Sequence, residues 1–195
     1  MRGRSDPAAA LLSGVQNADA PPRMNVFLVG PMGSGKSAVG RQLAQRLALE
    51  FIDSDAEIEA RTGVDIAYIF EREGEAGFRS REAEVIDALS RRDRVLVSTG
   101  GGAILDASTR ERLRARGRVV YLRTSVDQQL ARTRRSNDRP LLNNDDPRGT
   151  LERLFEQRAP LYTEVAEIVV DTDGRKVKTV VDQICHQLGV EGLEP

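Results

Sequence analysis

The feature that most constrains the fold is the run Gly30-Pro31-Met32-Gly33-Ser34-Gly35-Lys36-Ser37, which fits the pattern Gly-x-x-x-x-Gly-Lys-Ser. It follows a short apolar run at residues 25–29, typical of a buried strand, and precedes residues 38–47, whose apolar side chains recur at helical spacing. A phosphate-binding loop lies between a strand and a helix in this way. The alternative is a glycine-rich turn without a ligand, and the flanking segments favour the phosphate loop.

In such a loop the glycines allow a tight curl, and successive backbone N–H groups point toward phosphate oxygens. The start of the following helix adds the positive end of its dipole. We expect Lys36 to contact the β- and γ-phosphates and the Ser37 hydroxyl to bind Mg²⁺. The sequence therefore predicts a site for a nucleoside triphosphate with Mg²⁺, formed by Gly33, Ser34, Gly35, Lys36, Ser37 and Ala38.

The composition describes a globular chain whose partners are small molecules. With 195 residues it is long enough for one domain with a proper core. A net charge of −1 and the absence of a long apolar run argue against nucleic-acid and membrane partners. The single cysteine, Cys185, excludes an internal disulfide and favours the cytoplasm. The only histidine, His186, is expected to have no catalytic role.

The chain divides into three parts. Residues 1–23 are rich in Pro, Ala, Gly and Ser, only faintly resemble a signal peptide, and are expected to be a disordered extension. Residues 24–190 are expected to form a single domain, and residues 191–195 a tail. We expect a monomer, although the sequence carries no direct signal of the oligomeric state.

Short apolar runs alternate with helical patterns along the domain. The expected strands are residues 25–29, 50–52, 95–98, 119–122 and 167–170. The expected helices are residues 38–47, 56–61, 66–73, 75–90, 108–116, a helix after Ser125, 147–162 and 176–188. This alternation predicts an α/β fold with a parallel sheet. Ligands of such sheets bind at the carboxyl ends of the strands, so the residues there are the candidates for a site.

Two aspartates leave the second expected strand beside the phosphate loop. Asp53 and Asp55 are two residues apart, so both carboxylates can face the cleft if the strand continues. One could hold the waters of Mg²⁺ and the other contact the phosphate acceptor. Capping of the next helix is the competing interpretation, and the two roles can coexist.

An ion pair interrupts the apolar stripe of residues 75–90. At helical spacing Phe78, Val85 and Leu89 share one face, Glu82 falls within it, and Arg79 lies one turn earlier at its edge. A buried ion pair adds little stability, so its presence suggests a ligand pocket. We expect Arg79 to bind an anionic group and Glu82 to orient it, with a surface pair as the alternative.

Three further features complete the candidate site. The run of glycines at residues 100–102 would let the backbone approach a small ligand, or form a plain flexible turn. The arginine-rich segment 132–144 is expected to be a mobile lid, with Arg139 contacting the transferred phosphate and Arg132 stacking on adenine. Arg158 would provide a second guanidinium for a carboxylate, although by itself it fits an ordinary surface arginine.

In this order, the motifs resemble those of shikimate kinases from Met24 to about Leu188. They are the phosphate loop, Asp53-Ser54-Asp55, Phe78-Arg79 with Glu82, Gly100-Gly101-Gly102, Arg139-Pro140-Leu141-Leu142 and Arg158-Ala159-Pro160-Leu161-Tyr162. The resemblance implies a three-layer P-loop NTPase fold with strand order 2-3-1-4-5. It also implies transfer of the γ-phosphate of ATP to the 3-hydroxyl of shikimate, in the route to chorismate and the aromatic amino acids.

The resemblance also assigns roles. Arg79, Arg158 and the Gly101 amide look like the contacts of the shikimate carboxylate, with Glu82 beside Arg79. Asp55 resembles the residue that orients or deprotonates the nucleophilic hydroxyl, which makes Lys36, Asp55 and Arg139 the expected catalytic residues. Asp53 and Ser37 resemble the Mg²⁺ site. Arg132, Arg139 and, as a guess, Arg175 resemble contacts of ATP.

Two alternatives stay open. Another small-molecule kinase of the same fold, acting on gluconate or a nucleoside monophosphate, would share the loop and the lid. A regulatory module that binds ATP without transferring phosphate would leave the acceptor residues unused.

Overall fold

The computed structural model describes residues 24–133 and 145–190. The expected extension at 1–23, the tail at 191–195 and all of the expected lid except Arg132 and Thr133 lie outside the described residues. The division of the chain into an extension, one domain and a tail therefore stays a prediction.

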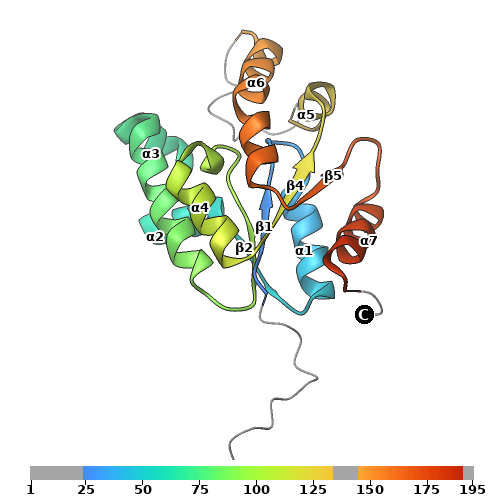
Figure 1. Cartoon of the computed structure of the whole chain (residues 1–195). Helices are drawn as coiled ribbons and strands as arrows, with labels where there is room; N and C mark the ends of the chain where they lie inside the picture. Colours follow the sequence, from blue (N-terminus) through green and yellow to red (C-terminus); the bar gives the residue numbers. More distant parts are fainter. Residues whose placement is uncertain (1–23, 134–144, 191–195) are drawn as a thin grey trace, which may run out of the picture.

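Five parallel strands form one sheet in the order β2-β3-β1-β4-β5, as the family resemblance implied. The strands are β1 (Val26–Val29), β2 (Glu50–Asp53), β3 (Val95–Ser98), β4 (Arg118–Arg123) and β5 (Ile168–Asp171). Helices cover both faces, which confirms the expected α/β fold (Figure 1). The central strand is β1, so the segment that follows it lies in the middle of the sheet's carboxyl edge.

The helices form a layer on each side of the sheet. They are α1 (Lys36–Arg46), α2 (Ser54–Thr62), α3 (Ile66–Ser90), α4 (Ala107–Arg116), α5 (Val126–Thr133), α6 (Pro147–Val165) and α7 (Val177–Leu188), with a short 3₁₀ helix, η2 (Ala103–Leu105). Helices α1 and α7 pack together on one face, and α3, α4 and α6 cover the other (Figure 1). Within the described ranges, no helix combines the length and the apolar character needed to cross a membrane.

The two core clusters follow from the alternation of side chains along the strands. In β1, Val26 and Leu28 pack with α1 and α7, whereas Phe27 and Val29 pack with the helices of the opposite face. All four of these side chains are fully buried. The only cysteine, Cys185 of α7, is also buried, and burial raises the pKa of its thiol.

The helix boundaries differ from the expected ones in two informative places. Helix α2 begins at Ser54, directly after β2, because the Asp53 carboxylate accepts a hydrogen bond from the Asp55 backbone at 3.1 Å and caps the helix. Helix α3 runs through the expected break at Gly74, which has φ 69° and ψ −177°. The helical conformation is therefore interrupted at Gly74, as the sequence predicted. The two expected helices join across this kink and together form α3.

The start of α5 is capped by two residues from different parts of the chain. The Ser125 hydroxyl accepts from the Gln128 backbone at 3.2 Å, as a capping box requires. The Ser125 backbone N–H donates to the Asp173 carboxylate, at 3.0 Å, where a capping box would use the side chain of Gln128. The loop after β5 therefore fixes the start of the helix that carries Arg132 in its last turn.

Asn25, just before β1, ties the amino end of β1 to the loop before β3. Its side-chain amide donates to the Arg92 carbonyl at 2.6 Å, and its side-chain oxygen accepts from the Val95 backbone at 3.2 Å. We expect Asn25→Ala to lower the free energy of unfolding by about 1–3 kcal/mol, because buried backbone groups lose their partners. Denaturant titration measures this, with Gln45→Ala on the exposed face of α1 as the control. Equal stability of the two variants would contradict the prediction.

Candidate functional site

The phosphate loop closes around the side chain of its own lysine. Gly30, Gly33 and Gly35 have φ of 146°, 75° and 92°, a backbone conformation that glycine adopts without strain. The Lys36 ammonium donates to the Gly30 carbonyl at 2.8 Å and to the Pro31 carbonyl at 2.9 Å. No side chain caps α1, so the first N–H groups of this helix remain available to an anion.

Ser37 and Asp53 meet at the edge of this loop. The Ser37 hydroxyl donates to Asp53 Oδ2 at 2.8 Å, while Oδ1 of the same carboxylate accepts from the Asp55 backbone. Asp53 therefore caps α2 as one interpretation predicted, and it also faces the phosphate loop, while its role at Mg²⁺ stays a prediction. A hydroxyl and a carboxylate are hard oxygen ligands that suit Mg²⁺.

Asp55 is a buried carboxylate directed into the cleft. Its Oδ1 has no hydrogen-bond partner. Burial raises the pKa of Asp55 to about 6, with contributions from Glu82 and Asp53, although Lys36 and Arg79 act in the opposite direction. A carboxylate with such a pKa is partly protonated just below neutral pH, which is suited to accepting a proton from a substrate.

The Arg79–Glu82 pair joins a buried carboxylate to a partly buried guanidinium. Arg79 Nη1 donates to Glu82 Oε2 at 2.6 Å, and only 1% of Glu82 is exposed. The other carboxylate oxygen, Oε1, has no partner. Burial raises the pKa of Glu82 despite the charge of Arg79. The alternative of an ion pair on the protein surface is therefore wrong. The buried Glu82 carboxylate holds the Arg79 guanidinium in place.

The glycines after β3 make room for these side chains. A β-carbon at Gly100 would lie 2.1 Å from Glu82 Oε1 and 2.9 Å from Asp55 Oδ1. One at Gly102 would lie 2.3 Å from the Arg79 guanidinium. The sequence predicted that glycines here admit a ligand close to the backbone. At Gly100 and Gly102 the space is filled by the protein's own charged groups.

Arg158 of α6 is buried without a direct ion pair to another described residue. Only 5% of it is exposed, its Nε has no partner, and it forms no ion pair with a described residue. Burial lowers the pKa of Arg158, and the nearby Arg79 adds to this. Two guanidinium groups facing one space, one of them unpaired, form a binding site for an anion.

Arg132 and Arg175 lie on the other side of the phosphate loop. Arg132 Nη1 donates to the Gly33 carbonyl at 2.9 Å, and Nη2 donates to the Thr172 carbonyl at 3.0 Å. Arg175 donates to the Asp171 carbonyl at 3.2 Å and to the side chain of Gln183. Arg132 lines the cleft, whereas Arg175 is not among its lining residues.

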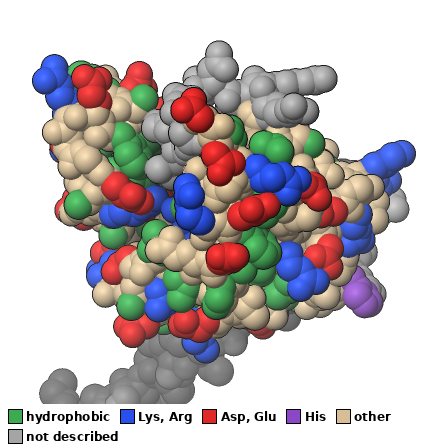
Figure 2. Space-filling model, turned by 90° about the horizontal axis from the view of Figure 1, so that it is seen from above, with side chains coloured by type: hydrophobic (Ala, Val, Ile, Leu, Met, Phe, Trp, Pro, Cys, Tyr) green, Lys and Arg blue, Asp and Glu red, His purple; other side chains and the backbone are tan. Residues whose placement is uncertain are grey.

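These groups line one cleft of about 830 Å³ at the carboxyl edge of the sheet. It brings together the expected nucleotide side, Gly33, Gly35, Lys36, Ser37, Ala38 and Arg132, and the expected acceptor side, Asp55, Arg79, Glu82, Gly101 and Arg158. Asp53, expected with Ser37 at the Mg²⁺ site, also lines the cleft. Viewed from above, acidic and basic side chains are intermixed over this end of the molecule (Figure 2). The arrangement fits two ligands bound side by side, each with negative charge.

The comparisons with known proteins agree with this geometry. The family model described as shikimate kinase matches residues 32–189. The chain belongs to the shikimate kinase family. A curated shikimate kinase of Shewanella amazonensis is 56% identical over 167 residues, which cover 86% of this chain and 98% of the relative.

Solved shikimate kinases share the fold. The enzyme of Acinetobacter baumannii, solved in complex with shikimate, has a TM-score of 0.85 at 46% identity and covers 89% of this chain and 97% of its own. The enzyme of Bacteroides thetaiotaomicron has a TM-score of 0.78 at 31% identity and covers 85% of this chain and 98% of its own.

Several lining residues had no signal of function in the sequence. Ile66 and Phe70 of α3 form an apolar wall of the cleft, and Phe70 packs on Phe78 with ring centroids 4.8 Å apart. Apolar residues at helical spacing are indistinguishable from core residues in a sequence. Ser34, expected at the nucleotide, is buried within the phosphate loop and is not among the residues that line the cleft. Arg139, the expected lid arginine, lies outside the described residues and stays a prediction.

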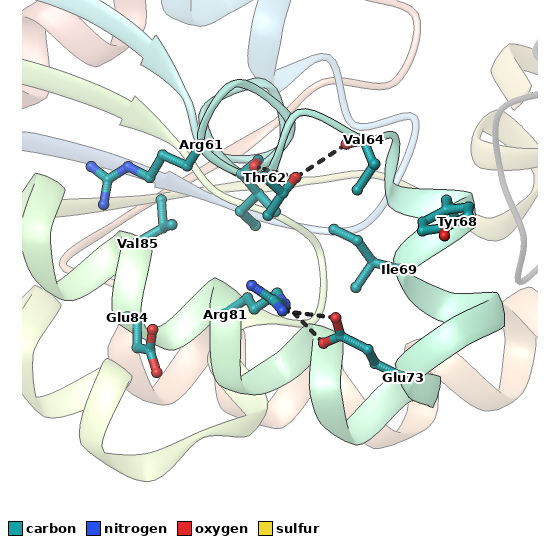
Figure 3. A pocket seen from close by; sticks show the side chains of 10 residues that line it. Arg61, Thr62, Val64, Tyr68, Ile69, Glu73, Arg81, Glu84 and Val85 are labelled. Atoms are coloured by element: carbon teal, nitrogen blue, oxygen red, sulfur yellow. Dashed lines mark hydrogen bonds and ion pairs between the residues drawn. The ribbon is translucent and has the colours of Figure 1, made fainter.

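A second hollow of about 520 Å³ lies between α2 and α3. Figure 3 shows Arg81 reaching Glu73 across it, with donor–acceptor distances of 2.8 and 2.7 Å, so that the two side chains bridge the break at Gly74. Arg61, at its rim, is paired with Glu57. Because these arginines are paired, we assign no substrate to this hollow.

Proposed function

We propose that the protein transfers the γ-phosphate of ATP to the 3-hydroxyl of shikimate, giving shikimate 3-phosphate and ADP. The observation that carries this proposal is the pairing of a phosphate loop with two guanidinium groups, the partly buried Arg79 and the buried Arg158, in one cleft. The first suits a nucleoside triphosphate and the second a small carboxylic acid. Membership of the shikimate kinase family and the shikimate complex of a relative support this substrate.

On the nucleotide side, the backbone of residues 33–38 and the Lys36 ammonium would bind the phosphates of ATP. Ser37 and Asp53 would hold Mg²⁺ together with the phosphates and water, because their oxygens lie side by side. When bound, Mg²⁺ neutralises charge that develops on the phosphates. Arg132, Arg139 and Arg175 would add contacts to the adenine and the transferred phosphate.

On the acceptor side, Arg79, Arg158 and the Gly101 amide would bind the shikimate carboxylate, and Glu82 would fix the orientation of Arg79. Asp55 would accept a hydrogen bond from the 3-hydroxyl and take its proton as the oxygen attacks the γ-phosphate. Its unpartnered Oδ1 and raised pKa suit this role. The catalytic residues would thus be Lys36, Asp55 and Arg139.

The test is ADP release by the purified protein with Mg-ATP, with and without shikimate, and with gluconate and AMP as competing acceptors. We expect strong release with shikimate alone. Release only with another acceptor would keep the nucleotide assignment and overturn that of Arg79, Glu82 and Arg158. ATP binding without release under any condition would instead support a regulatory module.

We further propose that the protein acts as a monomer in the cytoplasm, with small-molecule partners only. The single buried cysteine supports the cytoplasm, and the net charge of −1 argues against a nucleic-acid partner. Sedimentation at micromolar concentration measures the oligomeric state, and a stable dimer would contradict it.

A further inference from the structure

Two stacked tyrosines lie beneath the glycine turn of the acceptor site. Tyr121 of β4 and Tyr162 of α6 have ring centroids 4.9 Å apart and planes inclined by 26°. Tyr121 is 1% exposed and Tyr162 is fully buried. The two residues thus share one environment and one kind of ring packing, and they differ in what their hydroxyl groups contact.

Only one of the two hydroxyl groups has a hydrogen-bond partner. The Tyr162 hydroxyl donates to the Gly101 carbonyl at 2.5 Å, whereas the Tyr121 hydroxyl is buried without a partner. A buried hydroxyl without a partner costs free energy, so a phenylalanine at position 121 would pack at least as well as Tyr121. The hydroxyl of Tyr162 has a specific contact, and this contact lies at the acceptor site.

The Gly101 backbone packs directly on the phosphate loop. A β-carbon at Gly101 would lie 3.5 Å from the Gly30 carbonyl oxygen, 3.5 Å from the Met32 nitrogen and 3.6 Å from the Tyr162 oxygen. Three successive glycines have unusually many backbone conformations when unrestrained. A hydrogen bond to the middle one restricts the orientation of the peptides on both sides of it.

The same hydroxyl lies near the second arginine of the site. Arg158 lies one helical turn before Tyr162 on α6. Burial raises the pKa of Tyr162, and the nearby positive charge of Arg158 opposes this effect. The Tyr162 hydroxyl therefore lies between the Gly101 peptide and the Arg158 guanidinium, two groups that come from different elements of the chain.

We propose that the Tyr162 hydroxyl is a positioning group, which holds the Gly101 peptide and the Arg158 guanidinium so that both face one bound carboxylate. This inference rests on the proposed function, since it concerns the carboxylate of the same acceptor. Tyr162 does not touch the substrate in this role. It keeps two binding groups in the orientation that the ligand requires. Less conformational entropy is then lost when the ligand binds.

The chain provides its own matched control. Tyr162→Phe removes a hydroxyl that has a hydrogen-bond partner, and Tyr121→Phe removes a hydroxyl without one from the same stack. We expect Tyr162→Phe to raise the KM and Kd of shikimate about 3- to 10-fold, the effect of losing one hydrogen bond. The KM of ATP and kcat should change by less than about 2-fold. Tyr121→Phe should leave all of these values unchanged.

An acceptor without a negative charge separates positioning from general loss of structure. In shikimamide the carboxylate is replaced by a neutral amide, and we expect weak binding to wild type and to both variants. The further penalty of Tyr162→Phe should shrink for this analogue, because the groups that Tyr162 positions contribute less to its binding. Equal penalties for shikimate and shikimamide would overturn the proposal.

The remaining outcomes are also decisive. Equal increases of the shikimate KM in both tyrosine variants would assign the effect to the stack and overturn the role of the hydroxyl. A lower melting temperature of Tyr162→Phe with an unchanged shikimate KM would show a structural role only, which also overturns it. Wild-type protein without shikimate-dependent ADP release would overturn this proposal together with the proposed function, whereas the other outcomes leave the proposed function standing.

Discussion

Asp55→Asn is expected to lower kcat by about 100- to 10,000-fold, the usual contribution of a general base. The amide keeps the shape of the side chain and cannot accept the proton of the 3-hydroxyl. Steady-state ADP release with saturating Mg-ATP and shikimate measures the change. The control is Asp106→Asn, which removes a helix-capping carboxylate of α4 that does not line the cleft. A kcat equal to that of the control would contradict the role of Asp55.

The raised pKa of Asp55 adds a dependence on pH. In wild type, kcat should fall as the pH is lowered through about 6, because the protonated carboxyl accepts no proton. The folded-state pKa of about 6 lies above the ordinary value of 3.8, so the folded protein binds this proton more tightly than the unfolded chain. The ionised carboxylate therefore destabilises the folded protein. The free energy of unfolding should fall as the pH rises from 3.8 to about 6.

Asp55→Asn should consequently be more stable than wild type at pH 7.5. The rise of the pKa from 3.8 to about 6 corresponds to about 3 kcal/mol at most. Below about pH 4 the advantage should disappear, since the carboxyl is then protonated in both states. Calorimetry of the ligand-free protein in EDTA at pH 4.0 and 7.5 measures both values, and an equal difference at the two pH values would contradict the assignment.

Arg158→Met is expected to raise the KM of shikimate about 10- to 100-fold, because the ligand loses a charge-assisted hydrogen bond in a buried site. Methionine fills a similar volume. The ligand-free variant should be as stable as wild type or more stable, since the buried guanidinium forms no ion pair within the described part of the chain. Lower affinity together with undiminished stability identifies a residue kept for binding.

The matched control is Arg110→Met. Arg110 of α4 is also largely buried, but it donates to the Ile104 carbonyl at 2.8 Å and pairs with Glu164 at 3.2 Å. Its loss should reduce stability and leave the KM of shikimate unchanged. If Arg158→Met instead resembled Arg110→Met in both measurements, Arg158 would be a structural residue.

The sequence predicted the architecture where a local pattern carries it. Alternating apolar runs and helical patterns predicted the parallel sheet, and the phosphate loop could be placed because its motif lies within one segment. The strand order came from the family resemblance, because the order in which strands pair leaves no mark on any single strand. The short helix η2 was missed, since three residues in 3₁₀ conformation have no periodicity of their own.

The site was predicted unevenly for a similar reason. Glu82 was recognised because a charge within an apolar stripe is visible in the sequence. By itself Arg158 fitted an exposed arginine, because its burial depends on the glycine turn and on α3, which are distant in the chain. Tyr162 was overlooked as a positioning group because a tyrosine in a core position does not reveal what its hydroxyl contacts.

Because the only cysteine is buried, the surface of this protein exposes no native thiol. Cys185 lies within α7, where the raised pKa of its thiol disfavours the reactive thiolate. A cysteine introduced at Tyr68, which is 45% exposed on α3, would therefore be labelled selectively by a maleimide dye. The same half of α3 lines the acceptor cleft with Ile66 and Phe70, so fluorescence from this single probe would follow substrate binding. Tyr68 would be the only residue changed, because the native cysteine need not be removed.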